Sequence, residues 1–223
     1  MDTELGFSFM LSMRVATIAL LVVTVPGLAL AWLQARRRYP GKVLVDGLVL
    51  LPLVLPPTVV GYFLVVLFGR RGFLGPSLES LLGLSVIFTP TAAVLASAIV
   101  ALPLLVKTAQ PAIENVPVEL EQVASSLGLS PVALFFRVTL PAAWRGILAA
   151  LVLAFARALG EFGATLMFAG HIPGKTNTMP LEIFAAYQSG NDSLALTYVV
   201  VLTGLSLLVV TVAARMSPGT SNR

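Results

Sequence analysis

The sequence contains no cysteine and a single histidine, His171, and only 11% of its 223 residues are charged. The absence of cysteine excludes disulfides, thiolate metal sites and thiol nucleophiles. One histidine, without a second imidazole or a thiol, gives neither a metal-ligand set nor a base–nucleophile arrangement. We therefore expect no metal site and no catalytic site in this chain.

Charged residues are too few for an ordinary soluble domain, in which about 25% of residues are charged. Hydrophobic residues make up 57% of the chain, and the mean hydropathy is +0.96. The formal charge of +4 does not indicate nucleic acid binding, because the basic residues lie between apolar runs rather than on one solvated face. These features predict an integral membrane protein.

Five apolar runs are long enough to cross a bilayer, which takes about 20 residues of helix. They cover residues 10–33, 43–68, 85–108, 146–169 and 194–214, and predict an all-α membrane protein with a single transmembrane domain over 10–214. The first run could instead be a signal peptide cleaved near Ala29. We favour a span, because Asp2 and Glu4 precede the run where positive residues would be expected.

The distribution of Lys and Arg predicts the orientation, because cytoplasmic loops carry an excess of both. Four basic residues fall outside if the N-terminus is external, namely Arg14, Arg70, Arg71 and Lys175. Nine then fall on the cytoplasmic side, namely Arg36, Arg37, Arg38, Lys42, Lys107, Arg137, Arg145, Arg215 and Arg223. We therefore expect an external N-terminus and a cytoplasmic C-terminus.

Residues 170–178, GHIPGKTNT, look at first like a phosphate-binding loop. That motif needs four residues between its first glycine and Gly-Lys-Thr, so that backbone N–H groups surround the phosphates. Here only three intervene, and the predicted orientation places the segment outside the cell. We expect a solvated loop and no nucleotide site.

The largest polar interruption covers residues 114–145, between the third and fourth spans. It begins with an amphipathic helix, in which Glu121 lies on the polar side. The apolar stripe of that helix consists of Leu120, Val123, Ala124 and Leu127.

A stop and a start signal follow this helix. Gly128 ends it, and Ser130 with Pro131 forms an N-cap and first-turn pair for a second helix, which we expect to end before Pro141. The segment is thus a cytoplasmic helical hairpin. Periodicity alone leaves open whether it lies on the lipid headgroups or docks a partner.

The hairpin sequence ELEQVASSLG, followed by FFRVTLP, resembles the cytoplasmic EAA loop of ABC importer permeases. The positions that match the pattern are Glu121, Ala124, Gly128, Leu140 and Pro141. Val123 stands where the first alanine of the pair is usual, but valine also fits an apolar helix face. The resemblance implies that these residues couple the permease to an ATPase.

Further segments resemble the molybdate permeases of bacterial ABC importers. They are YPGK (39–42), LPLVLPPTVVGY (51–62), GRRGFLG (69–75), FARALGEFGAT (155–165) and IPGKTNTMP (172–180). Sulfate permeases are similar in the hairpin and in the span that holds Arg157 and Glu161.

This resemblance implies a bacterial inner-membrane permease that acts as a homodimer. Two cytoplasmic ATPase subunits, which would hold ATP and Mg²⁺, and an external molybdate-binding protein would be its partners. No cofactor is expected on this chain. Two copies are also physically reasonable, because five helices are few to enclose the path of a hydrated dianion.

Arg157 and Glu161 are four residues apart in the fourth span, which would place them on one helix face. Arg157 could face the transport path, or the two could form an ion pair that fixes packing. We favour the pair, because a neutral pair attracts a dianion little. Gly160 and Gly163 flank Glu161 and would permit close helix approach or local distortion.

The prolines of the second span predict a break, because each removes a backbone donor. Broken helices at membrane depth are tolerated where they face protein or water. Pro56, Pro57 and Thr58, together with Arg157, Glu161 and Gly163, are therefore candidates for the pathway or a gate.

Three alternatives to molybdate import stay open. A sulfate or tungstate permease of the same type would share the motifs. A membrane scaffold would use the hairpin only to lie on the bilayer. A secondary transporter would require internal repeats and an embedded coupling-ion site, and the sequence has no convincing repeat.

Overall fold

The computed structural model describes residues 2–82 and 85–216, and within them it contains helices and no strands. The helices are α1 (Asp2–Arg36), α2 (Lys42–Val54), α3 (Pro57–Phe68), α4 (Gly75–Leu82), α5 (Pro90–Glu114), α6 (Val118–Ser126), α7 (Pro131–Leu134), the π-helix η1 (Phe135–Thr139), α8 (Leu140–Leu159), α9 (Gly163–Phe168), α10 (Met179–Gln188) and α11 (Asp192–Met216). The predicted all-α fold is confirmed.

Within the described residues, four helical stretches are long and apolar enough to cross a bilayer, namely Glu4–Arg36, Pro90–Glu114, Pro131–Leu159 and Asp192–Val212. The fifth predicted span is a bent pair, because the axes of α2 and α3 differ by 110°. The break falls where the sequence has consecutive prolines, Pro56 and Pro57. Five spans are therefore present if the bent pair counts as one.

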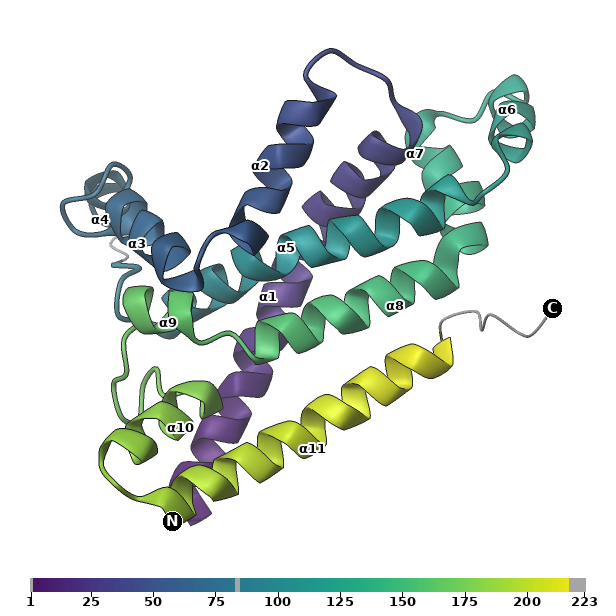
Figure 1. Ribbon diagram of the computed structural model, residues 1–223. Helices are drawn as coiled ribbons and strands as arrows, with labels where there is room; N and C mark the ends of the chain where they lie inside the picture. Colours follow the sequence, from purple (N-terminus) through teal and green to yellow (C-terminus); the bar gives the residue numbers. More distant parts are fainter. Residues whose placement is uncertain (1, 83–84, 217–223) are drawn as a thin grey trace.

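α5 lies at the centre of the molecule and packs against α1, α2 and α8 (Figure 1). In the 18-residue apolar segment of α5, 67% of the residues are buried, against 17% in the corresponding segment of α11. Alanines dominate the buried face of α5, and small residues let transmembrane helices approach closely. Where α8 crosses α5, a Cβ on Gly146 would lie only 2.3 Å from the Cβ of Ala112.

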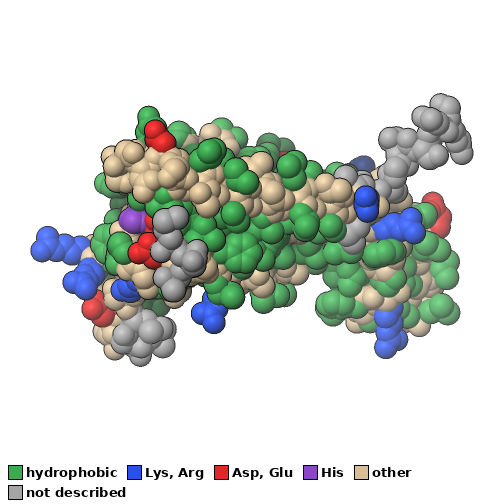
Figure 2. All heavy atoms as spheres, turned by 90° about the horizontal axis from the view of Figure 1, so that it is seen from below, with side chains coloured by type: hydrophobic (Ala, Val, Ile, Leu, Met, Phe, Trp, Pro, Cys, Tyr) green, Lys and Arg blue, Asp and Glu red, His purple; other side chains and the backbone are tan. Residues whose placement is uncertain are grey.

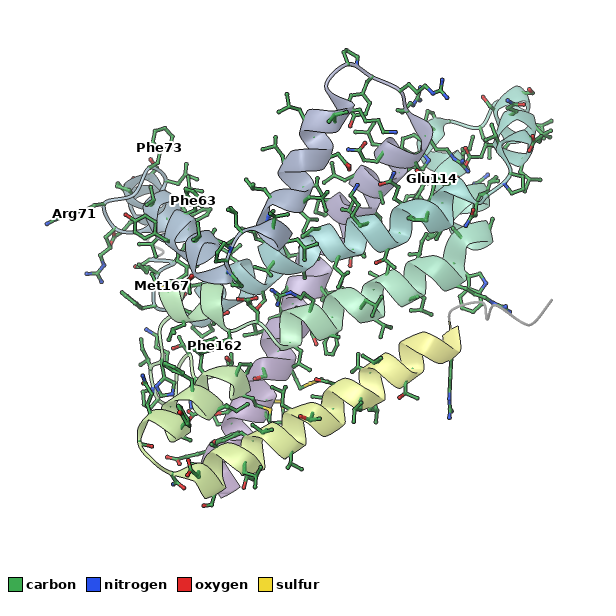
Figure 3. All side chains as sticks on the ribbon, in the orientation of Figure 1. Phe63, Arg71, Phe73, Glu114, Phe162 and Met167 are labelled. Carbon is green, nitrogen blue, oxygen red and sulfur yellow. The ribbon has the colours of Figure 1, made fainter. Side chains whose placement is uncertain are left out.

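The two ends of the molecule differ from its middle. The start of α1 and the end of α11 lie at opposite ends, with α9 and α10 near the start of α1 and α6 near the other end (Figure 1). Charged side chains gather mostly at these two ends, and hydrophobic side chains cover the region between them (Figure 2). Arg71 and Phe73 lie at the end opposite Glu114 (Figure 3).

Two predicted span boundaries are wrong. The third span begins at Pro90 rather than at residue 85, because Thr89 caps the helix by accepting from the N–H of Ala92, and it continues to Glu114. The fourth run is not one helix over 146–169. A continuous helical stretch starts at Pro131 and ends at Leu159, and α9 follows after a break.

The prediction of a solvated loop at residues 170–178 is also wrong in part. Lys175 is exposed, but Thr176, Asn177 and Thr178 are buried. The Thr176 hydroxyl donates to the carbonyl of Gly170, and Asn177 Nδ2 donates to Ser8 of α1 at 3.2 Å. The loop thus packs against the first turns of α1.

Candidate functional site

α6 is fastened to the membrane helices by Glu121, a charged residue that is only 9% exposed. Arg36, the last residue of α1, places its Nε 3.0 Å from both carboxylate oxygens of Glu121. The hydroxyl of Thr139, in η1, donates to the same carboxylate at 2.7 Å. Because a buried carboxylate is tolerated when it is paired and hydrogen-bonded, Glu121 joins α1, α6 and η1 at one point.

Arg36 also binds the backbone that leads into α6. Its Nη2 donates to the carbonyl of Val116 at 2.8 Å, in the short link between α5 and α6. The sequence singles out Glu121 but neither of its partners. Arg36 is one of three consecutive arginines, and Thr139 lies 18 residues away from Glu121, so no local pattern marks them.

α6 packs inward through one residue from each side of its amphipathic pattern. Glu121 and Ala124 are buried, whereas Leu120, Val123 and Leu127 are 51%, 61% and 77% exposed. The ion pair with Arg36 accounts for the burial of Glu121, because it compensates the carboxylate. The three large residues of the apolar stripe face away from the body of the molecule.

Gly128 ends α6 with a left-handed backbone, at φ +84°. Its N–H bonds to the carbonyl of Ser125 at 2.9 Å, and the N–H of Leu129 bonds to that of Ala124 at 3.2 Å, which together form a Schellman motif. A Cβ at Gly128 would meet nothing within 4 Å. The glycine is therefore required for its backbone conformation rather than for close packing against the described part of the chain.

The second helix of the hairpin begins as predicted but does not end before Pro141. Ser130 accepts from the N–H of Ala133, and Pro131 occupies the first turn. The chain then passes through the π-helix η1, in which the N–H of Leu140 bonds to the carbonyl of Phe135, and continues into α8. Pro141 lies in the first turn of α8 after this change of register, so its missing N–H does not end the helix.

The two broken spans lie against each other. Pro57 is the first residue of α3, and a Cβ on Gly163, the first residue of α9, would lie 2.9 Å from the Cβ of Pro57 and 3.3 Å from the N of Thr58. One helical turn further along α3, a Cβ on Gly61 would lie 2.8 Å from the carbonyl oxygen of Ala164. Pro56, Pro57 and Thr58 are all exposed. Met167 of α9 also takes part in this contact, because a Cβ on Gly61 would lie 2.7 Å from its Cβ.

The predicted pair of Arg157 and Glu161 is present, but not on one helix. α8 ends at Leu159, and Glu161 lies in the break before α9. Its Oε2 is 2.8 Å from Nη1 of Arg157, and its Oε1 accepts from the N–H of Ala164 at 2.8 Å. Glu161 therefore pairs with α8 and caps α9 at once, and is 3% exposed. The Arg157 side chain remains 27% exposed.

Comparison with known proteins agrees with this architecture. Residues 27–222 match the family described as the inner membrane component of binding-protein-dependent transport systems. The chain is 44% identical over 212 residues to the molybdenum transport system permease protein ModB of Escherichia coli K12, with 93% of each chain covered. It is 36% identical over 222 residues to the sulfate transport system permease protein CysW of Synechococcus elongatus, covering 77% of that protein.

Solved structures give the same fold. A chain of the MetNI methionine ABC transporter superimposes with a TM-score of 0.65 at 17% identity, and 96% of this chain and 93% of that chain are covered. At this identity the likeness concerns the fold alone. Together with the match over residues 27–222, it leads to one assignment: the chain belongs to the family of inner membrane components of binding-protein-dependent transport systems.

Proposed function

We propose that the chain is the permease subunit of an ATP-driven, binding-protein-dependent importer of molybdate. The observation that carries this proposal is the 44% identity to a molybdenum permease over 93% of both chains. Sulfate import is the second candidate, favoured by the 36% identity to a sulfate permease. ATP and Mg²⁺ would bind to a separate ATPase subunit.

Coupling to ATP hydrolysis would run through α6. Its exposed stripe of Leu120, Val123 and Leu127 suits an apolar groove on an ATPase subunit. On its opposite face Glu121 holds α1 and η1, so a movement of α6 would be passed to two membrane elements. Rigid-body movement of this kind would convert closure of the ATPase pair into opening of the path.

The other residues of the matched pattern have supporting roles in this proposal. Ala124 leaves room for α6 to pack against the body, and Gly128 turns the chain into the second helix. Leu140 and Pro141 carry the chain from η1 into α8 without a gap. The hairpin would then move together with the span that follows it.

The transport path would pass the contact between the broken spans. Because α3 begins at Pro57, the N–H groups at its start, including that of Thr58, present the positive end of a helix dipole at membrane depth. Arg157 adds a cation that is balanced by Glu161. Such a site attracts an anion only weakly, which suits a path that must release its substrate.

Two copies would enclose this path. In one chain, only 17% of the residues in the 18-residue apolar segment of α11 are buried. One side of α3 is also exposed, including Tyr62, Phe63 and Val66. A symmetric dimer would cover such surfaces. An external N-terminus and a cytoplasmic C-terminus would place the end that carries α6, with its excess of basic residues, on the cytoplasmic side.

Cellular molybdenum tests this function. Cells that lack the gene, and cells in which it is restored, are grown at limiting molybdate with and without excess sulfate, and molybdenum is measured by elemental analysis. We expect molybdenum to fall without the gene and to return with it, with little effect of sulfate. Molybdenum content that is independent of the gene would overturn the molybdate assignment.

A further inference from the structure

An apolar groove of about 590 Å³ runs between α1 and the stretch formed by α7, η1 and α8. One wall is made by residues of α1 from Thr24 to Trp32, and the other includes Val132, Phe136 and Ile147. Two lining residues carry polar side-chain atoms: the hydroxyl of Thr24 already donates to the carbonyl of Leu20 at 2.7 Å, and the indole nitrogen of Trp32 is buried. The groove therefore offers no hydrogen bond to a polar ligand.

A second hollow, of about 330 Å³, adjoins the groove at the end of α1 and shares Trp32 and Pro131 with it. Its lining is more polar than that of the groove, and includes Arg36, Arg37, Glu121 and Ser125. Arg36 and Glu121 neutralise each other. Arg37 has no carboxylate within salt-bridge distance among the described residues, so the hollow carries one uncompensated positive charge.

Arg37 is also held at the junction of the two spaces. Its guanidinium carbon lies 5.8 Å from the ring centroid of Trp32, within the range of a cation–π contact. Trp32 in turn packs edge-on against Phe135 of η1, with 6.4 Å between ring centroids. A fixed cation thus stands where the apolar groove meets the polar hollow.

We infer that the groove and the hollow together bind one anionic phospholipid of the cytoplasmic leaflet. An acyl chain would lie in the groove, and the phosphate would contact Arg37. This inference concerns a lipid site and does not depend on which oxyanion the permease transports.

The dimensions favour an acyl chain over a helix of a second copy. Thr24 and Trp32 are eight residues apart, which is about 12 Å along α1 and less than one leaflet of a bilayer core about 30 Å thick. A spanning helix of a second copy would need a groove along the full thickness of the core, whereas an acyl chain stays within one leaflet.

The position of the hollow links the lipid to α6. Val118, Glu121 and Ser125 of α6 line it together with Trp32 of α1 and Arg37, the residue that follows α1. A headgroup bound there would fill the space between the hairpin and the end of the first span. The bound lipid would brace α6 in the position that Arg36 and Glu121 define.

Native mass spectrometry of the purified full chain tests this site. The delipidated protein is titrated with phosphatidylglycerol or phosphatidylethanolamine of the same acyl composition. We expect the first phosphatidylglycerol to bind about fivefold more tightly, the effect of one basic residue at an anionic surface. Arg37→Gln should abolish this preference, whereas Arg38→Gln, a change of the neighbouring exposed arginine that lines neither space, should preserve it.

Ala29→Phe tests the groove itself, because Ala29 lines it and the added ring would fill it. We expect weaker binding of both lipids, with elution and helical content unchanged. If elution or helical content changes in Ala29→Phe, the exposed Arg37→Gln gives an independent readout. Transport is not measured here, so a failed molybdate assignment leaves these results unaffected.

Four outcomes would overturn the lipid site. The first is equal binding of the two lipids to the unmodified chain, and the second is an equal loss of the preference for phosphatidylglycerol in Arg37→Gln and Arg38→Gln. The third is displacement of phosphatidylglycerol by millimolar inorganic phosphate, and the fourth is disulfide cross-linking of two copies through Val25→Cys. The third would indicate a phosphate site without a lipid. The fourth would place a second copy over the groove.

Discussion

Arg36, at the end of the first span, lies 3.0 Å from Glu121, and both side chains are about nine-tenths buried. The two residues are 85 positions apart in the sequence. Through this pair and Thr139, the hairpin is attached to the transmembrane helices at a single charged point.

Replacing Glu121 should loosen the hairpin. Glu121→Ala leaves the Arg36 charge and the Thr139 hydroxyl without their acceptor, and removing one partner of a buried pair costs about 3–5 kcal/mol. We expect a lower melting temperature of the purified chain and loss of ATP-coupled uptake. Glu119→Ala, an exposed acid of the same helix, should change stability by about 0.5 kcal/mol or less.

A double-mutant cycle assigns this effect to the pair. Arg36→Ala combined with Glu121→Ala should be less destabilised than the sum of the two single changes, because neither charge is then stranded. Strict additivity of the two changes would contradict a direct interaction.

Gly128→Ala should strain the turn between the two hairpin helices. A left-handed conformation costs a residue with a Cβ about 1–2 kcal/mol, whereas asparagine adopts it more readily. We expect reduced uptake for Gly128→Ala and a milder reduction for Gly128→Asn, measured at equal amounts of membrane-inserted protein. Because no atom lies within 4 Å of the added Cβ, equal and severe effects of both changes would point to a contact with a partner instead.

The exposed stripe of α6 should carry the affinity for the ATPase subunit. Leu127→Ser removes a side chain that is 77% exposed in the chain alone, so its folding should be unaffected. A central contact in an interface is worth more than about 1 kcal/mol, so we expect at least fivefold weaker binding of the purified ATPase subunit. Gln122→Ser, at an exposed polar position of α6, serves as the matched control.

The two glycines beside Glu161 should differ in their tolerance of a methyl group. A Cβ at Gly163 would lie 2.9 Å from Pro57, whereas the nearest atom to one at Gly160 is 3.7 Å away. Overpacking of this kind costs about 1–3 kcal/mol. Gly163→Ala should therefore lower the melting temperature and Gly160→Ala should not. Equal melting temperatures would show that the two broken spans are not in firm contact.

The roles of Arg157 and Glu161 can be distinguished by measuring both stability and transport in variants of each residue. Glu161→Ala removes both the ion pair and the cap of α9, and should destabilise the chain by more than the roughly 1 kcal/mol of a lost cap. Arg157→Gln leaves the cap in place and should have a smaller effect. If Arg157 also contacts the anion, Arg157→Gln will raise the KM of uptake at unchanged stability. A normal KM would restrict Arg157 to packing.

The sequence predicts those features of the fold that depend on local patterns. Apolar runs give the spans, paired prolines give the break after Leu55, and Gly128, Ser130 and Pro131 give the ends of the hairpin helices. The end of α8 at Leu159 could not be predicted from a local pattern. It depends on Glu161, whose carboxylate accepts from the N–H of Ala164 and so caps α9. No local pattern in this apolar run indicates that interaction.

The inward face of α6 was also beyond prediction from the sequence. Hydrophobic periodicity assumes that apolar residues are buried, but here a distant arginine makes burial of Glu121 favourable and leaves Leu127 exposed. The same limit applies to the loop at residues 170–178. Its polar residues read as solvated, although Ser8 and Gly170 supply buried partners.

The most direct measurement of the central claim is molybdate uptake by proteoliposomes that contain the permease, its ATPase subunit and the external binding protein. We predict accumulation of molybdate that requires both ATP and the binding protein, that persists in excess sulfate, and that is lost in Glu121→Ala. Accumulation of sulfate in preference to molybdate, or no ATP-dependent accumulation of either anion, would contradict the account.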